Sequence, residues 1–109
     1  MDVKQVLIEA RRLIAEKGWT QGTWARDENN VRCDTIDKAA VCFCGLGAIR
    51  AAANHPAADP IRDKIFIWQA EEFLNEASKV SDYVKFNDTP GRTREEVLAV
   101  FDRAIGELK

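Results

Sequence analysis

The two ends of the chain carry the apolar period of amphipathic helices. Near the N-terminus, apolar residues recur at three- and four-residue spacing: Val3, Val6, Leu7, Ala10, Leu13 and Ile14. A similar row closes the chain: Val97, Leu98, Phe101, Ala104, Ile105 and Leu108. This spacing places each row on one face of a helix. Asp2 with Gln5 forms a capping box before the first row. Thr93 with Glu96 forms another before the last, so we predict a helix start at both places.

Two further helices are predicted in the middle of the chain. One should begin near Asp37 and end before Pro56, and it is apolar on every side. A helix of this kind belongs in the centre of a bundle. Its small residues fall on one face, where another backbone can approach closely: Cys44, Gly47, Ala48 and Ala51. The other helix should begin at Asp59-Pro60, an N-cap followed by proline, and run to about Ser78.

Between the first two helices the helical period is lost. Residues 19–31 are consistent with a short irregular hairpin that turns at Asp27–Asn30. Residues 80–86 fit either an extended stretch or a short helical turn. Thr89–Arg92 fits a type II turn, with proline second and glycine third. We therefore expect a mainly α, single helical domain over residues 1–109, with four helices and a short β-hairpin or irregular insert after the first.

The composition is that of an ordinary folded protein. Hydrophobic residues make up 46% and charged residues 31% of 109 positions, which is enough for a core. The 16 basic and 18 acidic residues leave no basic excess, so nucleic acid is not expected as a partner. No signal peptide or membrane-spanning stretch is visible, so we expect no membrane association and a cytoplasmic location. The three cysteines, an odd number, are expected to be reduced thiols there.

Two cofactor signatures are incomplete. Gly45–Gly47 follows an apolar run, as in a dinucleotide fingerprint, but the third glycine and the alternating strands are missing. We expect no cofactor and interpret these glycines as sites of close helix packing. The cysteines and the single histidine could be counted as four zinc ligands: Cys33, Cys42, Cys44 and His55. On a helix, however, Cys42 and Cys44 point roughly 160° apart, so no metal site is expected.

The loop before the last helix is the best candidate for a ligand-binding site. Asn87 and Asp88 belong to a polar loop that runs into a helix N-terminus, where free N–H groups bind anions. Arg92 can bind a phosphate or carboxylate with two hydrogen bonds. A structural interpretation is favoured over this one. Asn87 or Asp88 can form an Asx turn, and Thr93 can cap the helix.

Cys44 is the candidate nucleophile. If its helix begins later than expected, near Cys42, the thiol lies in the first turn, where the N–H groups and the dipole favour a thiolate. Asp88 would then orient a group or take a proton, and Arg92 would hold an anionic substrate. Burial in an apolar helix would instead raise the pKa of the thiol and leave it inert.

Phe43–Ala48 and Phe86–Thr93 together resemble the two motifs of a family of small bacterial and phage-associated proteins, a domain of unknown function. The first segment is similar to an aromatic-Cys-x-x-Gly-Ala helix. The second is similar to an aromatic-Asn-Asp turn in which Gly-Arg-Thr opens the last helix. The resemblance spans nearly the whole chain and implies these shared positions: Cys44, Gly47, Ala48, Asn87, Asp88, Gly91, Arg92 and Thr93. It implies no activity.

These observations favour a small non-enzymatic binding or interaction domain, because no complete catalytic set is present. Its site, if it has one, would be the Asn87–Thr93 loop with the surface around Trp19 and Trp24. A protein or a small anionic ligand would be the partner. The alternative is a small Cys44-dependent enzyme acting on an anionic substrate, which requires Cys44 to lie near Asp88. A third interpretation is that the same residues only lock two helices and a turn together.

Overall fold

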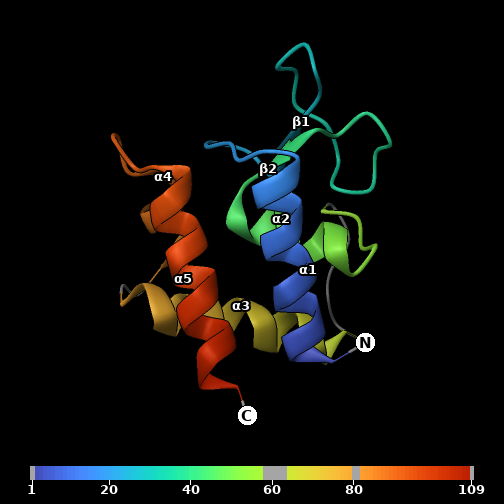
Figure 1. Cartoon of the computed structure of the whole chain (residues 1–109). Coiled ribbons are helices and arrows are strands. Elements are labelled where there is room, and N and C mark those ends of the chain that lie inside the picture. The colour runs from blue at the N-terminus through green and yellow to red at the C-terminus, as the bar shows by residue number, and fades with distance from the viewer. Residues whose placement is uncertain (1, 58–63, 80–81, 109) are drawn as a thin grey trace.

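The fold is mainly helical, with a small sheet after the first helix (Figure 1). The computed structural model describes residues 2–57, 64–79 and 82–108. Within them lie five helices: α1 (Val3–Glu16), α2 (Gly45–Ala52), α3 (Ile65–Ser78), α4 (Tyr83–Asp88) and α5 (Arg94–Glu107). Two short strands, β1 (Ala25–Arg26) and β2 (Cys42–Phe43), pair antiparallel. The predicted fold class is confirmed, and α4 shows which of the two alternatives holds near residues 80–86.

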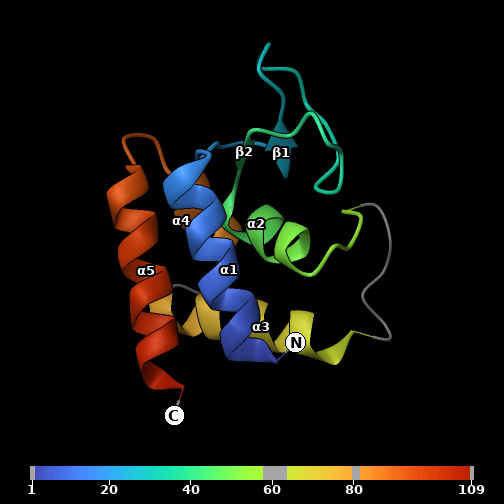
Figure 2. The same cartoon turned by 45° about the vertical axis from the view of Figure 1, so that its right-hand side comes forward.

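α1 is the helix around which the others pack. It contacts α2, α3 and α5. Figures 1 and 2 show α5 running alongside it and α3 crossing behind the lower parts of both. The apolar row predicted for this helix is buried: Val6, Leu7, Ala10, Leu13 and Ile14. The same core includes Ile49 of α2, Leu74 of α3 and Phe101 of α5, so the apolar faces of the helices meet in one core.

Both predicted capping boxes are present. The Asp2 carboxylate accepts a hydrogen bond from the Gln5 N–H at 2.8 Å, and the Gln5 side chain accepts one from the Asp2 N–H at 2.9 Å. Thr93 and Glu96 make the equivalent pair of bonds at the start of α5. These bonds satisfy N–H groups that have no partner within the helix, which is why both helix starts were readable from local sequence.

The predicted type II turn leads into α5. The Arg92 N–H donates to the Thr89 carbonyl at 3.0 Å, and Gly91 has a φ of +84°. The third position of such a turn requires a positive φ, which glycine adopts without strain.

The second helix is shorter than the sequence indicated. The predicted start near Asp37 is wrong, because α2 begins at Gly45 with Cys44 as its N-cap. The preceding residues turn and then pair with β1, since the Val41 N–H donates to the Arg26 carbonyl at 2.9 Å. Consequently Cys42 and Cys44 do not lie on one helix. The prediction that they hold no zinc ion assumed that they do. A short uncharged run is compatible with a buried strand as well as a buried helix.

The insert after α1 contains the predicted turn but extends beyond it. Asp27 Oδ1 accepts hydrogen bonds from the N–H groups of Asn29 and Val31, both at 2.9 Å. The sheet partner of β1 is β2, however, on the far side of a loop over residues 27–41. The predicted start of the third helix at Asp59-Pro60 lies outside the described residues, while its predicted end at Ser78 is confirmed.

The glycines of α2 are sites of close packing, as predicted. A Cβ at Gly47 would overlap the backbone carbonyl of Trp24, so the approaching backbone belongs to the insert and not to another helix. A Cβ at Gly45 would overlap the Tyr83 ring and hydroxyl. The small residues therefore allow the insert and α4 to close over the start of α2.

Gly47→Ala should lower the free energy of unfolding by at least about 1–3 kcal/mol, because the Trp24 carbonyl cannot yield as a flexible side chain could. Chemical denaturation measures the change. Gly106→Ala is the matched control, since a Cβ there would meet no described atom within 4 Å apart from its own stretch of helix, and alanine favours the helix by about 0.5–1 kcal/mol. Equal stability of Gly47→Ala and the wild type would contradict the close approach.

Candidate functional site

A pocket of about 210 Å³ opens between the insert, the start of α2 and α4. We call it the α2–α4 pocket. Its lining residues come from these three segments: Gly22, Thr23, Trp24, Cys44, Leu46, Tyr83, Val84, Asn87 and Asp88. Trp24, Leu46 and Val84 supply apolar walls, while Cys44 and Asp88 add a thiol and a carboxylate. Concave sites of this composition, apolar with a few convergent polar groups, are where small ligands bind in proteins.

The side chain of Asn87 joins the three segments that form this pocket. Its Oδ1 accepts hydrogen bonds from the Trp19 indole N–H at 2.8 Å and from the Gly45 N–H at 3.1 Å. Its Nδ2 donates to the Thr20 carbonyl at 3.2 Å and to Asp88 Oδ1 at 3.0 Å. Only 1% of Asn87 is exposed. Because an amide has two acceptor and two donor positions, Asn87 is fully used within the protein.

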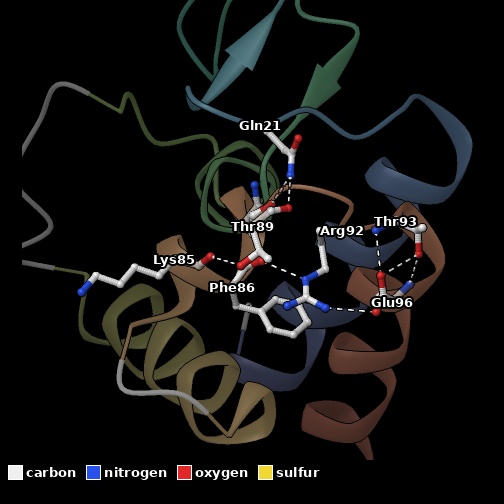
Figure 3. Close-up of polar contacts among 8 residues, drawn as sticks. Gln21, Lys85, Phe86, Thr89, Arg92, Thr93 and Glu96 are labelled. Atoms are coloured by element: carbon white, nitrogen blue, oxygen red, sulfur yellow. Dashed lines mark hydrogen bonds and ion pairs between the residues drawn. The ribbon is translucent and has the colours of Figure 1, made fainter.

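Asp88 also links the insert to α4, and it uses only one of its two carboxylate oxygens to do so. Its Oδ1 also accepts a hydrogen bond from the Gly22 N–H at 3.0 Å. Gln21 donates from Nε2 to the Asn87 and Thr89 carbonyls at 2.9 and 3.0 Å, which ties the insert to the end of α4 (Figure 3). The hydrogen bonds that Asp88 makes to described residues fall on Oδ1, so Oδ2 is available on this exposed lining residue.

Arg92 and Thr93 serve the turn and the last helix. Arg92 donates from Nε to the Phe86 carbonyl at 2.9 Å, and its guanidinium lies 3.8 Å from the centre of the Phe86 ring. Its Nη1 donates to Glu96 at 3.0 Å (Figure 3). Thr93 accepts the Glu96 N–H as the cap of α5. Of the four ligand-binding residues predicted from the sequence, Asn87 and Asp88 line the pocket, and Arg92 and Thr93 do not.

Cys44 lies at the helix start that the enzyme hypothesis required, in the same pocket as Asp88. Its sulfur accepts a hydrogen bond from the Gly47 N–H at 3.2 Å. Burial and, to a smaller extent, the negative charge of Asp88 nevertheless raise the pKa of the Cys44 thiol to about 11. The thiol is therefore neutral near pH 7, so the helix start does not activate it.

Tyr83 is the pocket residue that sequence reasoning missed. It is 1% exposed, and its hydroxyl is a buried polar group with no hydrogen-bond partner in the described part of the chain. Burial also raises its pKa, so the phenol stays neutral. Its ring stacks on Phe86 with 5.7 Å between centroids. Buried tyrosine hydroxyls usually have a partner, so this exception requires an explanation. The one feature of the sequence that could have indicated a large side chain here is Gly45, which makes room for the Tyr83 ring.

The two tryptophans expected at a contact surface have other roles. The indole N–H of Trp19 is used by Asn87. Trp24 lines the pocket, and the Arg50 guanidinium lies 4.4 Å from its ring centre. Among the described residues, no three His, Cys, Asp or Glu side chains gather closely enough to hold a metal ion. No helix in those residues has the length and apolar character needed to cross a membrane.

The fold and the pocket define a small helical domain whose insert and fourth helix close over the start of α2. The chain belongs to the family of unknown function DUF6197, whose family model matches residues 1–107. The resemblance to an uncharacterised family is thereby confirmed. Comparison with curated proteins and with solved structures gives no match. The family brings no activity with it, so function has to be argued from the pocket.

Asn87→Ala should lower the free energy of unfolding by roughly 2–4 kcal/mol, because it leaves the buried groups of Trp19, Gly45 and Thr20 without their partner. Urea denaturation tests this. Lys85→Ala, an exposed position on the same helix, should change stability by less than about 0.5 kcal/mol. If both variants behave alike, Asn87 does not hold the segments together.

The alkylation rate of Cys44 should rise about tenfold per pH unit from pH 7 to pH 10 without levelling off, since its pKa is about 11. The measurement uses the Cys33→Ser, Cys42→Ser protein. The same protein in denaturant is the control, and its rate should level off above the ordinary thiol pKa of about 8.5. A plateau below pH 8 in the folded protein would reveal a stabilised thiolate.

Proposed function

We propose that this domain binds a small molecule in the α2–α4 pocket. The observation that carries the proposal is the Tyr83 hydroxyl, which is buried against this pocket without a partner. An unsatisfied buried polar group costs about 1–3 kcal/mol, a large fraction of the stability of a small domain. A ligand atom that accepts or donates a hydrogen bond there, after a small movement of the ring, would offset this cost.

The volume of the pocket limits the size of the ligand. A cavity of about 150 Å³ in another protein binds benzene, so about 210 Å³ corresponds to roughly eight to ten non-hydrogen atoms. The walls are held by Asn87 and Asp88, whose hydrogen bonds fix the insert against α4. Such preorganisation reduces the conformational entropy lost on binding.

Binding is a better account of the pocket than catalysis. The Cys44-dependent enzyme needs a thiolate, but burial and the charge of Asp88 both raise the pKa of this thiol. Arg92, which was to hold an anionic substrate, is bound to Phe86 and Glu96. The structural-lock interpretation explains Asn87, Arg92 and Thr93 but leaves the Tyr83 hydroxyl unexplained.

We also propose a cytoplasmic setting in a bacterial or phage-associated context. Cys33, Cys42 and Cys44 are all free thiols, which suits a reducing compartment. The bacterial and phage context rests on the resemblance of the two sequence motifs. Nucleic acid remains unexpected as a partner, given the nearly balanced charge.

Ligand-observed NMR with a library of fragments of about ten non-hydrogen atoms tests the proposed function. Fragments should bind the wild type and lose binding to Val84→Trp, which places an indole in the pocket. Ile8→Trp is the matched control, because Ile8 is 48% exposed and Val84 46%. Absence of any binding fragment, or equal binding to both variants, would overturn the proposal.

A further inference from the structure

We propose that the ligand of the α2–α4 pocket is a small organic cation, an amine, amidine or guanidine attached to an apolar body. This inference rests on the proposed function and adds the charge of the ligand to it. It replaces the anionic ligand that the sequence suggested. Four features of the pocket support this inference. They are the charge of its lining, the partners of the nearby arginines, the partners of the N–H groups at the start of α2, and the arrangement of its polar and apolar groups.

Among the described residues that line the pocket, Asp88 is the only Asp, Glu, Lys or Arg. The other ionisable lining residues, Cys44 and Tyr83, are neutral because burial raises the pKa of each. The carboxylate of Asp88 is held in place through Oδ1, by the Gly22 N–H and the Asn87 side chain. Its Oδ2 is available, and it can accept a charge-assisted hydrogen bond from a cation.

The arginines near the pocket are already paired with other groups. Arg50 binds Glu71 at 3.2 Å, donates to a backbone carbonyl at 3.1 Å and stacks on Trp24. Arg92 is paired with Glu96 and bound to the Phe86 carbonyl. Neither guanidinium lines the pocket, so neither offers a bidentate contact to an anion there.

The start of α2 is not an anion site either. A helix N-terminus attracts anions through N–H groups that lack partners. Here the Gly45 N–H donates to Asn87, the Gly47 N–H donates to the Cys44 sulfur, and the Ala48 N–H donates to the Cys44 carbonyl. These three donors are used within the protein. In the described lining of the pocket, the side-chain polar groups that remain open are Asp88 Oδ2, the Tyr83 hydroxyl and the Thr23 hydroxyl, and none of them is cationic.

The arrangement of these groups fits a molecule with a cationic end and an apolar body. Asp88, which carries the carboxylate, is exposed, whereas the Tyr83 hydroxyl is buried. Leu46, Val84 and Trp24 form apolar surface in the same pocket. A cation would bind at Asp88, its apolar body would contact these walls, and an atom at the far end would pair with Tyr83.

Three probes of equal size and different charge test the inference: benzamidine, benzamide and benzoate. Each is titrated into isotope-labelled protein, with the Gly22 amide and the Trp24 indole N–H as reporters. Benzamidine should bind at least about tenfold more tightly than benzamide, and benzoate should bind least. Added salt should weaken benzamidine binding and leave benzamide binding nearly unchanged.

Asp88→Asn should remove the preference for benzamidine while keeping the acceptor oxygen for the Gly22 N–H. Asp102→Asn, which removes the same charge from an exposed position on α5, should keep the preference. Equal binding of all three probes, or tighter binding of benzoate, would overturn the cation inference and leave the pocket as a binding site. If no probe binds, and the fragment library also fails, both the inference and the proposed function are overturned.

Discussion

The hydrogen bonds of Asn87 are the constraint on which the arrangement of this domain depends. One buried amide holds the segment after α1, the start of α2 and the end of α4 together. These segments are separated by up to 68 residues along the chain. The short β1–β2 sheet joins the insert to the residues before α2, and the Asn87 side chain joins α4 to both. A fully satisfied buried amide is specific as well as stabilising, because any other arrangement would leave its donors or acceptors unpaired. The α2–α4 pocket is the space that remains where the three segments meet.

The residues of the two sequence motifs divide between those that only hold the fold together and those that also line the pocket. Gly47 admits the Trp24 backbone, while Arg92 and Thr93 fix the turn and the start of α5. Asp88 both holds the insert and presents a carboxylate, so it belongs to the second group. Tyr83 contributes ring packing against Gly45 and Phe86, yet its hydroxyl gains nothing from the fold. The proposed ligand would supply the partner that this hydroxyl lacks.

Local signals predicted the fold, and non-local contacts were needed for the site. The capping boxes and the turn at Gly91 were predictable because each depends on residues a few positions apart. The start of α2 could not be predicted in this way, because an uncharged run such as the one before Gly45 is typical of both a buried strand and a buried helix. Asn87 and Asp88 were predicted in a polar loop, which is wrong because they are the last two residues of α4. Their partners in the insert follow no sequence period. Tyr83 gave no signal of its own, because only its tertiary surroundings leave its hydroxyl unpaired.

The stability of Tyr83→Phe tests the central claim most directly. Phenylalanine keeps the ring and its packing and removes only the hydroxyl. Because this hydroxyl has no partner among the described residues, it destabilises the ligand-free protein. The account predicts that the free energy of unfolding in urea rises by about 1 kcal/mol. A decrease of about 1 kcal/mol would show that the hydroxyl has a partner within the fold, and the pocket would then lack the feature that marks it as a binding site.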